Sequence, residues 1–80
     1  MSIRIAGFEW DEFNLSHLEH AHPHLDRNML EEIVSNAKGY VNYGRDKYGR
    51  NIYAVRRGRL LVLFNIRSGR LARIFSVREL

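Results

Sequence analysis

All four histidines fall within eight residues: His17, His20, His22 and His24. Imidazole titrates near neutral pH, so this group could transfer protons or bind a metal ion. In a metal site, His17 and His20 would lie one helical turn apart, and His22 or His24 could fold back from the following loop. Such crowding of ligands at one helix end is unusual, and the sequence has no HExxH pattern. We favour helix capping over metal binding, predict no metal and no cofactor, and leave the roles of His20, His22 and His24 open.

Arginine is concentrated in the second part of the chain. Residues 1–36 carry two Lys or Arg against seven Asp or Glu, whereas residues 37–80 carry eleven against two, and nine of these eleven are Arg. The guanidinium fork matches the geometry of a phosphate group. The C-terminal part is therefore typical of a surface for a polyanion or an acidic partner. A solvated sheet face balanced by its own acidic helices fits the same charges equally well.

Two groups of arginines lie beside expected turns. The first group is Arg56, Arg57 and Arg59, and the second is Arg67 and Arg70. Arginines at turns could follow a phosphate backbone. Exposed turns also collect arginine for solubility, so the grouping has two explanations.

Arg73 lies in a stretch that alternates like a strand. A period of two places Ser76 and Arg78 on the face opposite to Arg73, unless a bulge intervenes. The neighbours expected on its own face are Leu71, Phe75 and Val77. A charge in such surroundings requires a ligand, an ion-pair partner or a path to water. An internal salt bridge to a helix carboxylate explains this arginine at least as well as a ligand does.

Tyrosines alternate with cations in the middle of the chain. Tyr40, Tyr43, Tyr48 and Tyr53 are interleaved with Lys38, Arg45, Lys47 and Arg50. Aromatic rings beside cations are the combination that single-stranded RNA binding uses. Tyrosine also favours strands, so packing is the preferred explanation unless the rings are exposed.

The elements before residue 40 are predicted to be mainly helical. Residues 3–8 fit a short strand. Asp11 is a suitable N-cap for a helix that extends to about His20, and Asp26 is a suitable N-cap for a second helix. The apolar spacing of the second helix runs to Ala37, and Gly39 stands where a left-handed C-terminal residue is expected.

The period changes from helical to extended after Gly39. Strands are predicted at residues 40–43, 51–57, 59–66 and 70–78, with turns at 44–50, 58 and 67–69. Residues 60–64 lack alternation and are expected to be covered on both faces. The predicted fold class is α+β: an N-terminal short strand and two helices packed on an antiparallel β-meander of about four strands.

The composition fits one small domain over residues 1–80. The chain has 80 residues, 45% of them hydrophobic, and no repeat or linker. The absence of cysteine excludes disulfides, thiolate nucleophiles and sulfur-ligated zinc. No signal peptide or membrane-spanning apolar run is recognised, so we expect a cytoplasmic protein.

Two separated motifs resemble the BrnT family of toxins from bacterial toxin–antitoxin pairs. The first is Phe8-Glu9-Trp10-Asp11 followed by Asn14 and His17-Leu18. The second combines Gly58-Arg59-Leu60-Leu61-Val62 with Arg73-Ile74-Phe75-Ser76-Val77-Arg78. The match covers most of the chain in order. It implies a RelE-like ribonuclease fold, metal-independent RNA cleavage that inhibits translation, and neutralisation by a DNA-binding antitoxin of the ribbon-helix-helix type.

This resemblance leads to a set of expected site residues. The reaction would be attack of an RNA 2′-OH on the adjacent phosphodiester, with His17 as acid or base and Arg59 and Arg73 stabilising the phosphorane. Arg78 would position phosphate and Ser76 would orient its neighbours. Further RNA contacts are expected from Arg56, Arg57 and Tyr53. A noncatalytic nucleic-acid-binding module and an antitoxin-type partner-binding module are the alternatives, and homo-oligomer formation is left open.

Overall fold

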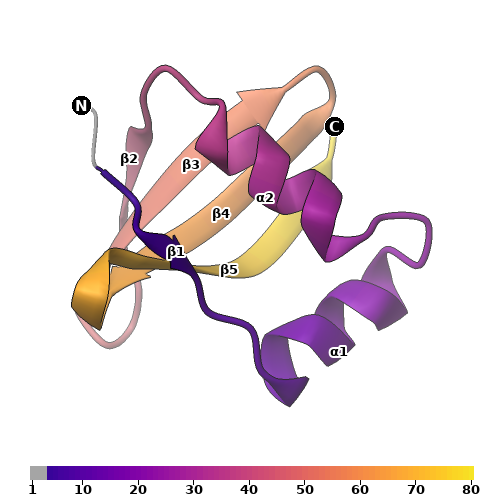
Figure 1. Cartoon of the computed structure of the whole chain (residues 1–80), viewed down its shortest axis with the longest axis horizontal. Coiled ribbons are helices and arrows are strands. Elements are labelled where there is room, and N and C mark those ends of the chain that lie inside the picture. The colour runs from indigo at the N-terminus through magenta and orange to yellow at the C-terminus, as the bar shows by residue number, and fades with distance from the viewer. Residues whose placement is uncertain (1–3) are drawn as a thin grey trace.

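In the computed structural model, which describes residues 4–80, two helices pack on one face of a five-stranded sheet (Figure 1). This arrangement confirms the predicted α+β class with strand, helices and meander in that order. The elements are β1 (Gly7–Phe8), α1 (Glu12–Ala21), α2 (Arg27–Ser35), β2 (Val41–Arg45), β3 (Asn51–Arg57), β4 (Leu60–Arg67), a 3-10 turn (Ser68–Arg70) and β5 (Leu71–Glu79). None of the helices in residues 4–80 has the length and apolar character needed to cross a membrane.

The sheet has the strand order β1-β5-β4-β3-β2. Strands β2 to β5 form the predicted antiparallel meander, and β1 lies parallel to β5 at the sheet edge. The expected N-terminal strand over residues 3–8 is shorter than predicted, because only Gly7 and Phe8 pair, and Ile3 lies outside the described residues. The glycines at the predicted turns, Gly44, Gly49, Gly58 and Gly69, all have positive φ, which other residues adopt rarely.

Asp11 begins α1 as predicted. Its carboxylate accepts hydrogen bonds from the backbone N–H groups of Phe13 and Asn14, and the Asn14 side chain accepts one from the N–H of Asp11. This reciprocal capping box satisfies donors that the first helical turn leaves without intrahelical partners. The Asn14 amide also donates to the carbonyls of Glu9 and Ile74, both at 3.0 Å. One buried side chain therefore fixes both the start of α1 and its position on β5.

Asp26 begins α2 as predicted, but the helix ends at Ser35 rather than near Gly39. Asn36 is the C-cap, and its backbone N–H donates to the carbonyls of Glu32 and Val34. Gly39 does not have the positive φ that was expected of it. The chain turns early because Tyr40 returns to the core, where its ring packs edge-on against Phe64 at 5.1 Å. The apolar spacing extends to Ala37 because Ala37 packs against the core, although it lies outside the helix.

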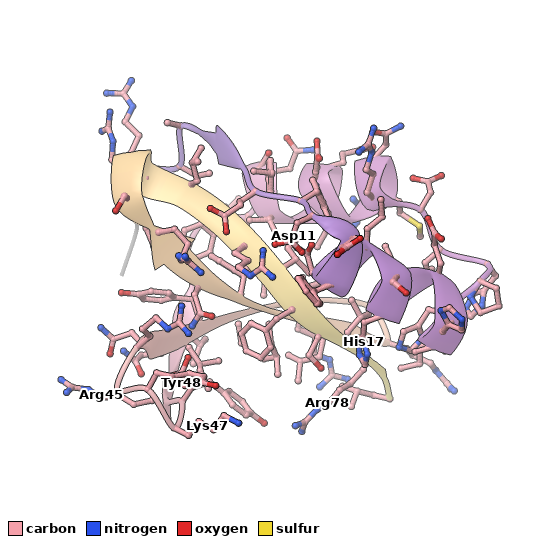
Figure 2. All side chains as sticks on the ribbon, turned by 90° about the horizontal axis from the view of Figure 1, so that it is seen from below. Asp11, His17, Arg45, Lys47, Tyr48 and Arg78 are labelled. Carbon is pink, nitrogen blue, oxygen red and sulfur yellow. The ribbon has the colours of Figure 1, made fainter. Side chains whose placement is uncertain are left out.

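The main core lies between the helices and the near face of the sheet. Its fully buried side chains are Leu30, Val34, Val62 and Phe64. Strand β4 is the central strand of the meander, and Val62, Leu63, Phe64 and Asn65 are all buried. The prediction that the apolar residues of β4 are covered on both faces is therefore confirmed. Both helices nevertheless lie on one side of the sheet (Figures 1 and 2).

A β-bulge in β5 decides which side chains share a face. Ile74 pairs with Phe64, whereas Ser76 pairs with Leu63, so Phe75 is an extra residue with no partner opposite. The bulge shifts the alternation by one residue. Arg73, which pairs with Asn65, and Arg78, which pairs with Leu61, therefore lie on the same face of the sheet. Val77, expected beside Arg73, instead joins Ala72 and Ile74 in the core.

Candidate nucleic-acid interface

The sheet face turned away from the helices, here called the open face, carries several of the predicted site residues. Its residues follow from the strand register, since cross-strand partners point to the same side. One row is Arg56, Leu61 and Arg78, and the next is Ala54, Leu63 and Ser76. Asn65 and Arg73 form a third row. The open face is therefore apolar along its middle and basic toward its edges.

Arg56 and Arg78 are two exposed cations of this face. They flank Leu61 in one row, which places their strands about 10 Å apart. The Arg56 Nε donates to the Gly58 carbonyl at 3.0 Å, which holds its side chain beside the turn. Within residues 4–80, neither arginine forms an ion pair. Both guanidinium groups can therefore contact an anionic ligand without breaking an internal salt bridge.

The loop between β2 and β3 borders the open face on one side. Asp46 organises this loop by accepting from the N–H groups of Tyr48 and Arg50 at 2.9 Å, and these bonds hold the pKa of its carboxyl below the usual value. The Tyr48 ring is 69% exposed and has Lys47 and Arg50 over it at 5.2 and 5.0 Å from the ring centre. A stacking surface and two cations therefore lie on one loop.

An open depression connects this loop to β5. It has a volume of about 430 Å³, and its lining includes Tyr48, Asn65, Arg73 and Phe75. On the other side of Phe75, a narrow crevice between α1 and β5 is lined by His17 and Ser76. Phe75 borders both hollows, so His17 and Tyr48 lie on opposite sides of its side chain, and Figure 2 shows the two labelled residues well apart.

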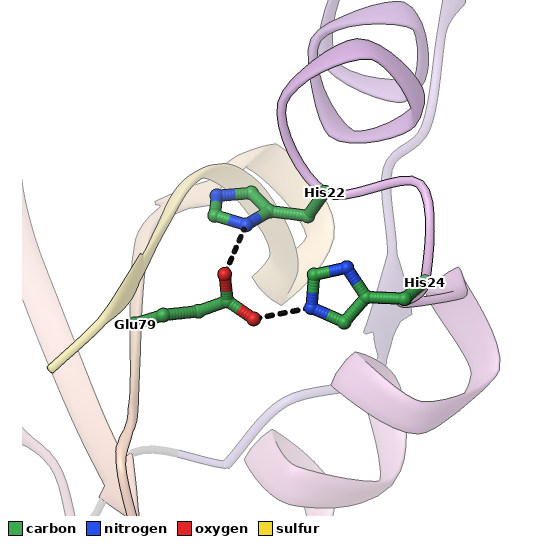
Figure 3. A group of neighbouring side chains, drawn as sticks. All are labelled: His22, His24 and Glu79. Carbon is green, nitrogen blue, oxygen red and sulfur yellow. Dashed lines mark hydrogen bonds and ion pairs between the residues drawn. The ribbon is translucent and has the colours of Figure 1, made fainter.

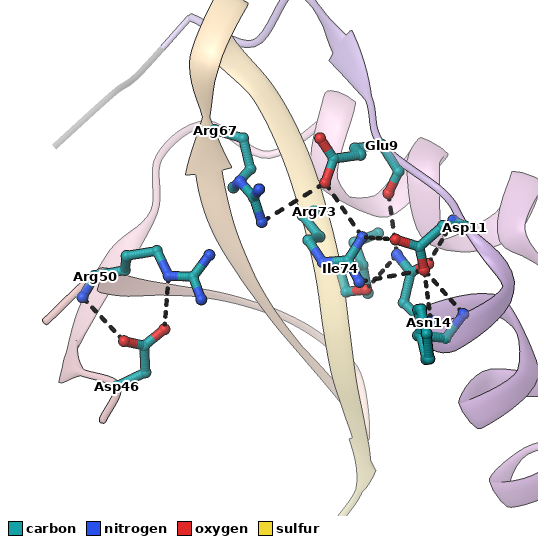
Figure 4. A network of polar contacts seen from close by, with 9 residues as sticks. Glu9, Asp11, Asn14, Asp46, Arg50, Arg67, Arg73 and Ile74 are labelled. Carbon is teal, nitrogen blue, oxygen red and sulfur yellow. Dashed lines mark hydrogen bonds and ion pairs between the residues drawn. The ribbon is translucent and has the colours of Figure 1, made fainter. Parts of the chain in front are cut away.

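The Arg73 guanidinium forms ion pairs with two carboxylates of the same chain. Its guanidinium contacts Asp11 with two nitrogens, at 2.7 and 3.2 Å, and Glu9 at 3.2 Å (Figure 4). The hydrogen bond from Arg73 holds the pKa of the Asp11 carboxyl below its usual value, and the same bond raises the pKa of Arg73. The internal salt bridge considered for this residue is therefore present, and Arg73 is only 17% exposed.

The three residues expected to share a catalytic centre do not converge. Arg59 lies in the β3–β4 turn, where its carbonyl accepts from the N–H of Leu80 at 2.7 Å. Arg73 pairs with Asn65, six residues after Arg59, which corresponds to about 20 Å at the strand rise. His17 is exposed on α1 and faces the β5 bulge. Of the expected set, His17 and Ser76 line one crevice beside β5, and Arg78 follows Ser76 on the same face of that strand.

Two other expected RNA contacts lie on the helix side of the sheet. Tyr53 pairs across the strands with Phe64, and the two rings are 5.9 Å apart, so Tyr53 is part of the core packing. Arg57 pairs with Leu60 and lines a hollow beside Ile33 of α2. Tyr53 and Arg57 therefore do not share a sheet face with Arg78, since their side chains point to the opposite side.

Exposure divides the four tyrosines into two pairs. Tyr40 and Tyr53 pack against Phe64, whereas Tyr43 and Tyr48 are exposed. Tyr48 was visible in the sequence as part of the tyrosine and cation alternation, but that pattern could not separate core rings from surface rings.

Comparison with protein-family models, with curated proteins and with solved structures finds no match for this chain.

Proposed function

We propose that this protein binds single-stranded RNA on its open face and cleaves it as the toxin of a toxin–antitoxin pair. One observation carries the binding step: Arg56 and Arg78, which form no ion pair within residues 4–80, lie on the sheet face that the exposed Tyr48 and its two neighbouring cations border. Arginine contacts phosphate, and an aromatic ring stacks on bases of any sequence. RNA therefore suits this surface better than an acidic peptide, which would leave the ring without a stacking partner.

The cleavage step is assigned to the part of β5 where the crevice lined by His17 meets Ser76 and Arg78 of the open face. In this step the neutral imidazole of His17 takes the proton from an RNA 2′-OH, and the 2′-oxygen attacks the adjacent phosphorus. The bond from phosphorus to the 5′-oxygen breaks, and that oxygen takes a proton from water. The products are a 2′,3′-cyclic phosphate and a 5′-hydroxyl. Arg78 stabilises the added negative charge of the phosphorane, a role for which it is better placed than the ion-paired Arg73.

The toxin assignment is supported by the resemblance of the Phe8–His17 and Gly58–Val62 motifs to the BrnT family. An antitoxin with a ribbon-helix-helix DNA-binding part would neutralise the protein by covering the open face. A noncatalytic RNA-binding module is the second candidate, and the ion pairing of Arg73 with Asp11 and Glu9 favours it, because one expected catalytic cation is already neutralised.

Binding is tested with a fluorescently labelled single-stranded RNA oligonucleotide and tag-free protein at several salt concentrations. Arg56→Ala and Arg78→Ala should each weaken binding about tenfold and lower the slope of log affinity against log salt by about 0.7, the value for one phosphate contact on a single strand. Arg27→Ala is the matched control, since Arg27 is an exposed arginine on α2. Unchanged binding by both open-face variants would refute the interface.

Cleavage is tested on the same RNA by identifying the product ends. Wild-type protein should give 2′,3′-cyclic phosphate ends in the presence of a chelator, and His17→Ala should reduce their rate of formation at least about a hundredfold. Binding that depends on Arg56 and Arg78 without any cyclic phosphate would establish the noncatalytic module instead. Induced expression of wild-type and His17→Ala proteins in bacteria then separates toxicity by cleavage from toxicity by binding.

A further inference from the structure

Two histidines and one glutamate meet where the α1–α2 connection touches the end of β5. His22 and His24 come from this connection and Glu79 comes from β5, and their ligating atoms all lie within 4.8 Å of one another (Figure 3). The His22 Nδ1 is 3.2 Å from one Glu79 oxygen, and the His24 Nε2 contacts the other oxygen. Residues more than fifty positions apart in the sequence thus aim nitrogen and oxygen ligands at one point.

The backbone fixes the direction of the His22 ring. His22 is the C-cap of α1, and its Nε2 lies 2.8 Å from the carbonyl oxygen of Val77. A carbonyl can only accept, so this nitrogen carries the proton. In the neutral ring the lone pair is then on Nδ1, the atom that faces Glu79. A histidine held by a backbone carbonyl on one nitrogen, with the other nitrogen available, is the usual arrangement of a metal-ligating imidazole.

We propose that His22 Nδ1, His24 Nε2 and the Glu79 carboxylate bind a divalent transition-metal ion of the zinc class. Two imidazoles and one carboxylate are the donor set of several zinc sites that keep a fourth position for water. Mg²⁺ and Ca²⁺ are disfavoured because they take mostly oxygen ligands, and this cluster offers a single carboxylate. The site uses neither His17 nor Arg78, so it is independent of the RNA proposal.

The geometry allows an ion to enter with small side-chain movements. Bonds of about 2.0–2.2 Å in a tetrahedral site place ligand atoms roughly 3.3 Å apart. The His22 side chain is 13% exposed and held in place, whereas those of His24 and Glu79 are 59% and 42% exposed and can move apart. The two imidazole nitrogens already face the two oxygens of the Glu79 carboxylate, so all three side chains are directed at one position.

The position of the site predicts what the ion would do. It would tie the connection between the helices to the C-terminal end of the sheet, a contact that the unfolded chain lacks. An ion that binds only the folded state stabilises it by an amount that grows with the logarithm of the ratio of free ion to Kd. At free Zn²⁺ about a hundredfold above Kd, the midpoint of thermal unfolding should rise by roughly 10 °C or more.

The test is titration of tag-free protein with ZnCl₂ by calorimetry and with CoCl₂ by visible absorption, which reports coordination directly. Wild-type protein should bind one ion per chain. His24→Ala and Glu79→Gln, both at exposed side chains, should each lower the affinity for Zn²⁺ about tenfold or more and, at the same Zn²⁺ concentration, reduce the thermal shift by about half or more. His22→Ala should do the same, and circular dichroism checks that each variant is folded.

His20→Ala is the matched control, because His20 belongs to the same histidine group but its ring contacts the Ser16 carbonyl within α1. It should bind Zn²⁺ like the wild type. Equal affinity in wild type, His24→Ala and Glu79→Gln would overturn the site. A loss in His20→Ala as large as in His24→Ala would also overturn it, since the ion would then be on the helix. Chelation should leave RNA affinity unchanged, so the two proposals fail separately.

Discussion

Arg73 on β5 holds Asp11, the N-cap of α1, through two guanidinium nitrogens at 2.7 and 3.2 Å (Figure 4). The same carboxylate accepts hydrogen bonds from the first turn of the helix. One ion pair therefore joins the strand to the helix start, and it places two acidic residues, Glu9 and Asp11, beside the open face. Its consequences can be measured through stability and through RNA binding.

The ion pair makes stability depend on pH in the acidic range. The folded-state pKa of Asp11 is lowered, so the unfolded chain takes up this proton first as pH falls. The stabilisation is complete above the unfolded value near 4 and is lost as pH falls through the lower folded value. Urea unfolding between about pH 5.5 and 2.5 should show this loss. Asp11→Asn should reduce this dependence of the free energy of unfolding on pH.

Asp46→Asn provides a second measurement of the same kind. The pKa of Asp46 is lowered by backbone N–H groups of its own loop rather than by Arg73. The two variants should therefore reduce the pH dependence by separate and additive amounts. A pH profile of Asp11→Asn that overlays the wild-type profile would contradict the assigned role of Arg73.

Asn14 should be among the most sensitive polar residues for stability. It is buried, completes the capping box, and donates to the carbonyls of Glu9 and Ile74. Asn14→Ala should lower the free energy of unfolding by about 2–3 kcal/mol, because it removes the cap contact and leaves buried carbonyls unpaired. Ser16→Ala, on the exposed side of α1, should change it by less than about 0.5 kcal/mol. Equal effects in urea unfolding would contradict this prediction.

Tyr48 should contribute to RNA affinity through its ring rather than its hydroxyl. Tyr48 is exposed, and Lys47 and Arg50 lie near its ring. Tyr48→Ala should weaken binding of a single-stranded oligonucleotide by about 1–3 kcal/mol, the range for stacking on one base. Tyr48→Phe keeps the stacking surface and should bind like the wild type in fluorescence anisotropy. A loss in Tyr48→Phe equal to that in Tyr48→Ala would instead indicate a hydrogen bond.

Local signals in the sequence predicted the local structure well. Asp11 and Asp26 cap their helices, and the turn glycines adopt the backbone conformation that only glycine takes easily. The continuous apolar run at residues 60–64 also predicted that β4 is the central strand of the sheet. These features depend on neighbours in the sequence, so the residue types suffice to find them.

The site depends on contacts that no local pattern contains. The bulge at Phe75 reversed the expected face of Arg78, and nothing in the alternating residues marks where an extra residue enters. The partners of Arg73 lie 62 and 64 positions away. Glu79 joins His22 and His24 from the far end of the chain, so reading the histidines alone predicted no metal site. Such long-range pairs become visible only when the strand register is known.

Arg73 should affect RNA binding without touching RNA. Removing its charge leaves Glu9 and Asp11 without their main cation beside the open face, and these carboxylates repel phosphate. Arg73→Ala should therefore weaken RNA binding, as direct contact by Arg73 would also predict. The double variant Arg73→Ala/Asp11→Asn separates the two explanations, because asparagine still caps α1 but carries no charge.

If Arg73 acts through Asp11, the double variant should recover most of the RNA affinity lost in Arg73→Ala. The coupling between the two substitutions, measured by anisotropy at low salt, should then be clearly nonzero. It should shrink as salt is added, since screening weakens the repulsion by exposed carboxylates. If Arg73 instead binds phosphate directly, Asp11→Asn will not restore binding, and the loss in the double variant will be as large as in Arg73→Ala. That result would return Arg73 to the RNA interface and would require its ion pair to open when RNA binds.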